Sequence, residues 1–105
     1  MIPTLHNLFT FSHTAETEEF FLLLQGKEFH LEHIISHSNT SPPDFWYDQE
    51  RPEWVALLKG KARLRFEEGE VEMSEGDYLL IPAGMKHRVD YTSEDAVWFA
   101  LHFSP

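Results

Sequence analysis

The chain has 105 residues, 42% hydrophobic and 25% charged, and these proportions are typical of one globular domain rather than of a disordered chain. Eighteen acidic residues against eight lysines and arginines give a net charge of −10, which disfavours binding to nucleic-acid phosphates or to an anionic membrane surface. The chain contains no cysteine, which excludes disulfides, thiolate metal sites and cysteine nucleophiles.

The N-terminal residues show no sign of a targeting or membrane segment. A basic stretch followed by an apolar run is lacking, and the longest apolar block, residues 20–24, is far shorter than the about 20 residues that cross a bilayer. We therefore expect a cytoplasmic protein with neither a nucleic-acid nor a membrane partner.

The first 27 residues are expected to form an N-terminal extension to a barrel over residues 28–105. Thr17 is a candidate N-cap for a short helix over residues 18–24. The apolar residues 20–24 lack a helical period, however, so a buried strand fits nearly as well. Residues 25–27 resemble a turn.

Residues 28–36 alternate in the manner of a strand, with Phe29, Leu31, His33 and Ile35 on one side. Residues 38–44 contain many turn formers and two prolines, which indicates a loop. Residues 45–49 predict a short aromatic strand that ends before Pro52, because proline cannot donate to a sheet ladder.

The remainder of the chain reads as short strands separated by turns. We expect strands over residues 53–58, 61–66, 70–73, 78–81, 87–91 and 96–103. In the hairpin between the second and third of these, Glu70 and Glu72 face three basic residues, Lys61, Arg63 and Arg65. These charges either form cross-strand pairs or only keep one face in water, and neither alternative implies a function. This succession of strands and turns is typical of an all-β sandwich or barrel in one domain.

Two short motifs resemble those of the cupin superfamily. Residues 76–87 read G-x5-P-x-G-x2-H and end at His87, and residues 53–60 read E-x6-G and begin at Glu53. Their order and spacing resemble the second and first motifs of small single-domain cupins. The resemblance implies a double-stranded β-helix, or jelly roll, whose two sheets enclose a pocket.

The resemblance also implies a divalent metal. In many cupins two histidines and the glutamate of the first motif join the histidine of the second motif around one ion. Glu53 and His87 match two of these ligand positions. We expect the two side chains to face each other across one enclosed cavity.

The histidine pair of the first motif is missing. Counting four residues back from Glu53 puts Trp46 and Asp48 in its place, and counting three puts Tyr47 and Gln49 there. Asp48, or Gln49 through its amide oxygen, is therefore a candidate ligand beside the two matched residues. Carboxylate, amide and imidazole donors of this kind suit a divalent ion such as Mn, Fe, Mg, Zn or Ni.

Further residues are candidates for the wall of a small-molecule pocket, namely Trp46, Tyr91, Trp98 and His102. Tyr91 alternates in phase with His87 along one strand, and His102 alternates with Trp98 along another. The other face of that last strand is more apolar, so His102 points inward only if the Trp98 side forms the pocket. The remaining histidines have no partner spacing and are expected to be surface or core residues: His6, His13, His30, His33 and His37.

Three functions remain open, the last being a stand-alone domain whose main property is self-association, and none of them identifies a substrate. In the first, the protein is a metal-dependent enzyme in which Glu53 is the catalytic residue, acting as a general base, and the metal acts as a Lewis acid or activates oxygen. In the second, the pocket binds or senses a small organic ligand without metal. We also expect a homodimer, because a small jelly roll leaves apolar surface uncovered.

Overall fold

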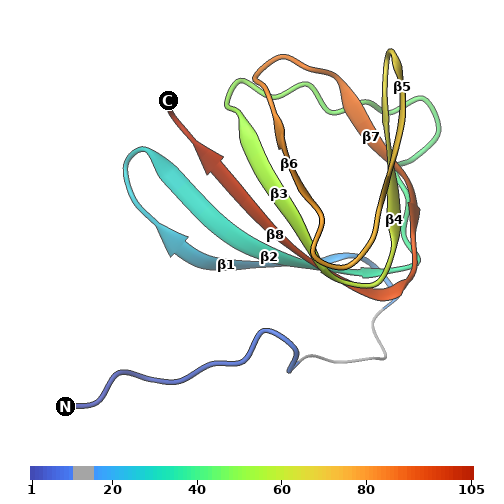
Figure 1. Cartoon of the computed structure of the whole chain (residues 1–105). Coiled ribbons are helices and arrows are strands. Elements are labelled where there is room, and N and C mark those ends of the chain that lie inside the picture. Colours follow the sequence, from blue (N-terminus) through green and yellow to red (C-terminus); the bar gives the residue numbers. More distant parts are fainter. Residues whose placement is uncertain (11–15) are drawn as a thin grey trace.

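The protein is described by a computed structural model that covers residues 1–10 and 16–105 (Figure 1). In chain order, the strands are β1 (Glu19–Gln25), β2 (Phe29–His37), β3 (Glu53–Lys59), β4 (Ala62–Phe66), β5 (Gly69–Met73), β6 (Tyr78–Ile81), β7 (His87–Thr92) and β8 (Glu94–Phe103). All regular elements in the described ranges are strands, and none of these residues forms a helix that could cross a membrane.

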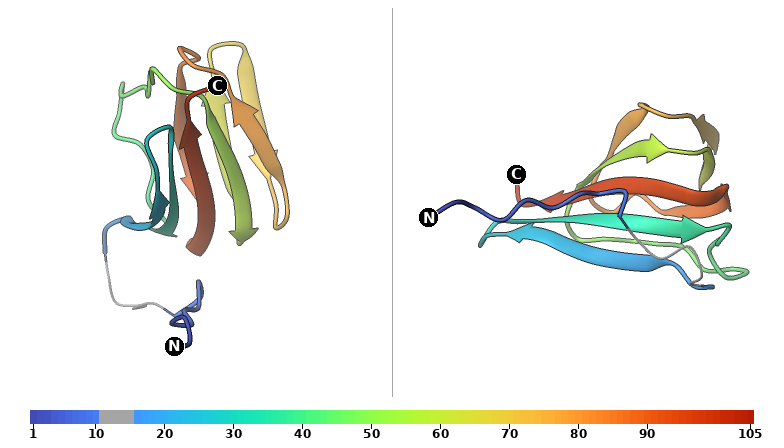
Figure 2. Two further views of the ribbon diagram at one scale, coloured as in Figure 1. Left: turned by 90° about the vertical axis from the view of Figure 1, so that its left-hand side faces the viewer. Right: turned by 90° about the horizontal axis from the view of Figure 1, so that it is seen from below.

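The strands form two antiparallel sheets that face each other (Figures 1 and 2). One sheet has the strand order β1-β2-β8-β3-β6 and the other has the order β5-β4-β7. The last strand, β8, lies between β2 and β3, so segments far apart in the sequence become neighbours in the centre of the larger sheet. The predicted all-β architecture of two sheets is confirmed.

The N-terminal part of the chain differs from expectation. Residues 18–24 do not form a helix, because Glu19–Gln25 hydrogen-bonds along β2 as an antiparallel edge strand. The larger sheet therefore begins inside the segment that the sequence suggested as an extension. The strand is also not buried, since Phe20 and Leu24 are 54% and 58% exposed. Residues 45–49 form only a single bridge, between Tyr47 and His87.

The core lies between the two sheets and is apolar. Its buried members are Val55, Leu57, Ala62, Leu64, Met73, Ile81, Ala96 and Trp98. The turn from β3 to β4 requires glycine at position 60, where φ is +90° and a Cβ would lie 2.4 Å from the Ser93 hydroxyl oxygen and 3.2 Å from Ala96. The glycine of the E-x6-G motif is thus explained by close packing of this turn against β8.

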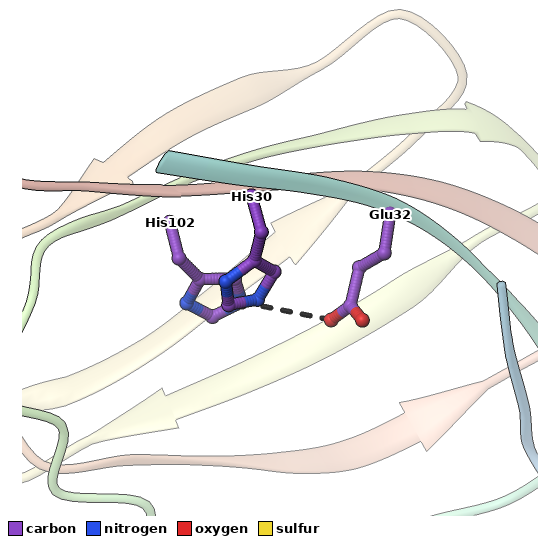
Figure 3. Close-up of side chains that lie close together, drawn as sticks. All are labelled: His30, Glu32 and His102. Carbon is purple, nitrogen blue, oxygen red and sulfur yellow. Dashed lines mark ion pairs between the residues drawn. The ribbon is translucent and has the colours of Figure 1, made fainter. Parts of the chain in front are cut away.

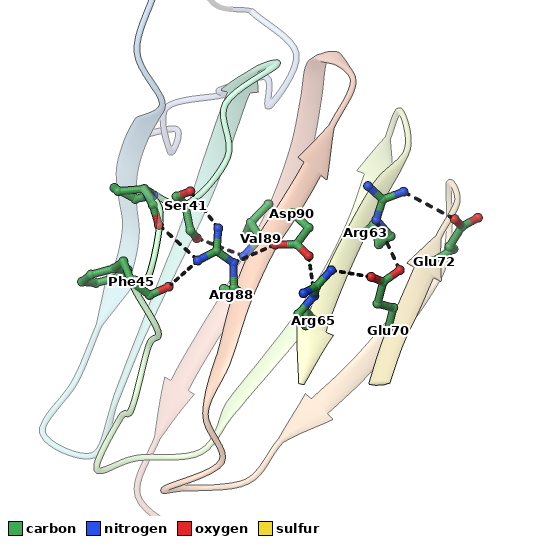
Figure 4. A network of polar contacts seen from close by, with 10 residues as sticks. Ser41, Phe45, Arg63, Arg65, Glu70, Glu72, Arg88, Val89 and Asp90 are labelled. Carbon is green, nitrogen blue, oxygen red and sulfur yellow. Dashed lines mark hydrogen bonds and ion pairs between the residues drawn. The ribbon is translucent and has the colours of Figure 1, made fainter. Parts of the chain in front are cut away.

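Charged side chains cover the outer surface of the three-stranded sheet (Figure 4). Arg65 donates to Glu70 at 2.7 Å, and Arg63 lies 3.8 Å from Glu72, so the predicted cross-strand pairs are present. Asp90 on β7 lies between two arginines, with Arg65 Nε and Arg88 Nε each 2.7 Å from its carboxylate.

Arg88 also fastens the loop that follows β2. Its guanidinium donates to the backbone carbonyls of Ser41, Pro42 and Phe45, each at 3.1 Å (Figure 4). Because these carbonyls come from residues just before Tyr47, the side chain of Arg88 holds in place the segment that leads into the bridge with His87.

Asp90→Asn is expected to lower the free energy of unfolding by about 1 kcal/mol at neutral pH, because both arginines lose a charged partner. The hydrogen bond from Arg88 and the charges of Arg65 and Arg63 lower the pKa of Asp90 below its ordinary value of 3.8. A carboxyl with a lowered folded-state pKa stabilises the fold above its ordinary pKa and loses that effect as the pH falls through the lower value. Urea unfolding of both proteins at neutral and strongly acid pH measures the difference.

The matched control is Glu72→Gln, because the Glu72 side chain is 81% exposed and lies 3.8 Å from Arg63. We expect that variant to change the free energy of unfolding by less than about 0.5 kcal/mol. Equal losses in the two variants, or a loss for Asp90→Asn that persists in strong acid, would contradict this account.

Candidate functional site

A pocket opens between the two sheets where the apolar core ends. It holds about 580 Å³ of space, including the part that is open to solvent. Val55, Leu64, Ile81 and Trp98 belong both to the core and to the pocket wall. The polar residues that line the pocket are Glu18, Glu32, Tyr47, Gln49, Glu53, His87 and His102.

Glu53 and His87 meet inside this pocket. Glu53 begins β3 and His87 begins β7, and they are only 9% and 5% exposed. Glu53 Oε1 lies 3.7 Å from His87 Nε2, while His87 Nδ1 donates to the Met85 carbonyl at 3.0 Å. Burial alone would lower the pKa of His87, but the Glu53 carboxylate and the Met85 carbonyl outweigh it and raise that pKa above its ordinary value.

The second carboxylate oxygen of Glu53 faces another imidazole. Glu53 Oε2 lies 3.5 Å from His102 Nε2, and Glu32 Oε1 lies 3.6 Å from the same nitrogen. His102 therefore points to the pocket along with Trp98 on the same strand. A chain of alternating acids and imidazoles runs through the pocket from Glu32 to His87.

His30 completes a cluster with Glu32 and His102 (Figure 3). Its ring stacks on that of His102, with centroids 4.4 Å apart. The potential ligand atoms of the three residues all lie within 4.8 Å of one another. Three ligand atoms on one ion stand about 3.1 to 3.8 Å apart when the metal–ligand bonds are about 2.2 Å long, so the side chains must close by about 1 Å to bind it. Two imidazoles and one carboxylate suit Fe, Mn or Zn, and the cluster could hold such an ion.

Strand register explains why these residues meet. Paired residues of adjacent strands point to the same side of a sheet, and the pairs here form one row across the larger sheet. That row runs from β6 to β1 through Ile81, Glu53, His102, His30 and Gln25. His30 was expected to have no partner, and this was wrong because β8 brings His102 beside it. The alternation of His30 and Glu32 was the only available signal.

In the loop before β3, one of the two candidate residue pairs lines the pocket and the other does not. Tyr47 and Gln49 line the pocket, whereas Asp48 is exposed and Trp46 lies outside, against Arg88 at 6.0 Å. Backbone hydrogen bonds of 2.7 and 3.1 Å tie Tyr47 to His87 and fix this alternation. The candidates Asp48 and Trp46 therefore do not face the pocket. Gln49 Oε1 is buried and has no hydrogen-bond partner in the described part of the chain.

The two remaining pocket candidates differ in position. Trp98 is 4% exposed and lines the pocket, and its Nε1 donates to Ser36 Oγ at 3.2 Å. Tyr91 does not line it. A register shift between β4 and β7 breaks the alternation after Val89, so Tyr91 is 44% exposed and lies 5.9 Å from Arg63 on the outer surface.

The other histidines lie away from the pocket. His37 is close to Glu19 at 2.9 Å and to Asp95 at 3.4 Å, and His33 stacks on Phe21. His6 is exposed, and His13 lies outside the described residues. The metal and catalytic roles expected for Gln49, Glu53 and His87 stay predictions.

Comparisons with known proteins agree with this architecture. The sequence pattern of the Cupin domain family matches residues 31–102. A crystal structure from Ralstonia eutropha JMP134, which bears the provisional name of a mannose-6-phosphate isomerase, is 39% identical in sequence. It covers 98% of this chain and 100% of its own, with a TM-score of 0.92.

More distant structures share the fold alone. A cupin superfamily protein from Desulfitobacterium hafniense DCB-2 is 12% identical over 99% of this chain and 95% of its own, with a TM-score of 0.80. KdgF from Halomonas sp. is 12% identical over 88% of this chain and 83% of its own, with a TM-score of 0.73. None of the curated proteins compared with the chain matches it.

Proposed function

Because the chain belongs to the cupin family, and its pocket holds a buried cluster of acids and imidazoles, we propose that it is a metal-dependent enzyme acting on a small organic ligand. The observation that carries this proposal is the position of the Glu53 carboxylate between His87 at 3.7 Å and His102 at 3.5 Å. A buried carboxylate with an imidazole at each oxygen is suited to moving a proton.

In this proposal His30, Glu32 and His102 hold the ion, since their ligand atoms lie within 4.8 Å of one another. A divalent ion bound there would polarise a carbonyl or hydroxyl group of the ligand. Glu53 would take a proton from the carbon beside a polarised carbonyl and return it to the carbonyl carbon, while the hydroxyl proton on the first carbon passes to the former carbonyl oxygen. Together these two transfers isomerise a hydroxy-carbonyl ligand. His87 holds the Glu53 carboxylate in position, and the apolar wall from Val55 to Trp98 limits access of water.

The comparison that supports isomerisation is the 39% identical protein from Ralstonia eutropha JMP134, whose provisional name is that of an isomerase. The sugar in that name supports a sugar-like ligand, and the phosphate in it is not carried over to this chain. For this chain, isomerisation and a sugar-like ligand are both proposals. Isomerisation requires a proton transfer, which is the role proposed for Glu53.

Metal binding is the first test. Calorimetric titration of chelator-treated protein with Mn²⁺ and Zn²⁺ is expected to show one ion per chain. His102→Ala should weaken binding at least about tenfold, because it removes a ligand and the partner of Glu32 and Glu53. His6→Ala, the same change at an exposed position, should leave affinity unchanged. Equal affinity in the two variants, or no binding by the unmodified protein, would contradict the proposal.

A second candidate is a binding or sensing cupin that works without metal. The observation in its favour is that Tyr47 and Gln49 occupy the places where many cupins have metal-binding histidines. Ligand binding that is unaffected by chelation, in protein that takes up neither ion, would favour this function over the enzyme.

We also propose a homodimer formed by the outer face of the five-stranded sheet. Two rows of paired residues cross that face. They consist of Leu80, Trp54, Leu101, Leu31 and Leu24, and of Tyr78, Ala56, Phe99, His33 and Phe21. Burial lowers the pKa of His33, and the other residues of this apolar band are uncharged. Two copies with a net charge of −10 each can approach most easily over such a surface.

A further inference from the structure

We infer that the pocket accepts small ligands that donate hydrogen bonds and carry no negative charge, and that it rejects phosphate esters and other anions. This inference rests on the proposal that the pocket is the ligand site. It goes further by assigning the chemical class of the ligand. Two observations support it: the acidic residues that line the pocket, and the buried Gln49 Oε1, which has no hydrogen-bond partner in the described part of the chain.

The pocket has three acids and no lysine or arginine among the described residues that line it. Glu32 and Glu53 face His102, and Glu18 accepts a hydrogen bond from Ser36 Oγ at 2.9 Å. Burial, together with the charge of Glu32, raises the pKa of Glu18 above its ordinary value despite that hydrogen bond. An anion entering this pocket would meet carboxylates in a poorly solvated space, where like charges repel strongly.

None of the four arginines, all of which the structure describes, lines the pocket, and Arg51, two residues before Glu53, donates instead to the Lys27 carbonyl at 3.4 Å. Arg63, Arg65 and Arg88 lie on the outer surface of the other sheet (Figure 4). Each already contacts a carboxylate there, and Arg88 donates in addition to three backbone carbonyls. The bidentate guanidinium contact that commonly recognises phosphate is therefore absent from the described lining of the pocket.

The polar atoms of the pocket are mainly acceptors. Gln49 Oε1 is buried and has no hydrogen-bond partner among residues 1–10 and 16–105, and a buried acceptor of this kind requires a donor. The Glu53 oxygens have only imidazole neighbours, at 3.5 and 3.7 Å, and so retain lone pairs for a ligand. Hydroxyl or ammonium groups supply the missing donors, and phosphate or carboxylate groups cannot.

A bound ion does not reverse this preference. Two positive charges on the ion oppose the charges of Glu32 and Glu53, and Glu18 is a further acid in the same pocket. The three carboxyl groups can thus carry one negative charge more than the ion neutralises. An anionic ligand would gain contact with the ion only at the cost of repulsion from the surrounding carboxylates.

The test uses three sugars that share a ring: glucose, glucosamine and glucose 6-phosphate. Each is titrated into ion-loaded and chelated protein, and binding is followed by amide chemical-shift changes at Tyr47, Gln49 and His87. We expect glucose or glucosamine to bind at least about tenfold more tightly than glucose 6-phosphate. If glucosamine binds more tightly than glucose, the pocket prefers a cationic ligand. If the two sugars bind equally, the pocket recognises their hydroxyl groups.

Glu18→Gln should raise the affinity for glucose 6-phosphate and so reduce the difference in affinity between glucose and glucose 6-phosphate. The change removes a carboxyl group from the pocket while keeping an acceptor for Ser36. Glu70→Gln, which removes an acid from the outer surface, should not change that difference. Equal or tighter binding of glucose 6-phosphate overturns the inference, and so does failure of all three sugars to bind. Metal titration of the same samples tests the proposed enzyme separately, so the two can fail independently.

Discussion

Replacing Glu53 by glutamine is expected to weaken binding of a divalent ion by about 10- to 100-fold, because its carboxylate orients the proposed ligand His102. The same change should lower the pKa of His87. Burial already acts to lower that pKa, and the negative charge that outweighs burial would be gone. Calorimetry measures the first effect, and NMR titration of the imidazole in chelated protein measures the second.

Glu32→Gln separates the two effects. Glu32 contacts His102 at 3.6 Å, whereas the acid beside His87 is Glu53. We expect this variant to weaken ion binding while leaving the pKa of His87 close to that of the unmodified protein. A His87 pKa that is unchanged in Glu53→Gln would show that the carboxylate does not control this imidazole, and the assignment of Glu53 as a base paired with His87 would then fail.

Leu80→Glu is expected to convert the proposed dimer into a monomer by raising the dimer dissociation constant at least about 100-fold. Leu80 is 53% exposed and lies beside Trp54 at one end of the apolar band, so a polar side chain is tolerated in the single chain but places two like charges in the interface. Sedimentation equilibrium measures the mass, which should fall from about twice 12.3 kDa to that of one chain.

Tyr91→Glu is the matched control, because Tyr91 is 44% exposed on β7 of the smaller sheet, where it lies against Arg63 on the outer surface. It should leave the mass unchanged. A monomeric mass for the unmodified protein throughout the micromolar range would rule out the dimer, and dissociation by both variants would argue against this face as the interface.

The sequence predicted the fold well because the signals were local. Alternation and turn residues marked every strand from β2 onward, and the two motifs fixed the family. The edge strand β1 was less clear, because a run of five apolar residues has neither the period of a helix nor that of a strand. These residues form a strand because they pair with β2, and pairing between strands cannot be predicted from the local sequence alone.

The site was predicted only in part for the same reason. Glu53 and His87 belong to motifs, so their presence in one pocket follows from the family resemblance. His30 lies 72 positions from His102 in the sequence, and nothing in the spacing of single residues indicates that β8 inserts between β2 and β3. Tyr91 was expected to line the pocket because it is in phase with His87, but a register shift between β4 and β7 turns its side chain outward.

The contacts of Arg88 link the surface of the protein to its interior. The guanidinium lies among the outer charges, yet it fastens the carbonyls of Ser41, Pro42 and Phe45, and the chain continues from these residues to the inward-facing Tyr47 and Gln49. Arg88 is thus one of the contacts, together with the backbone hydrogen bonds of Ser41 to Val89 and of Tyr47 to His87, through which a substitution on the outer surface would shift side chains that line the pocket.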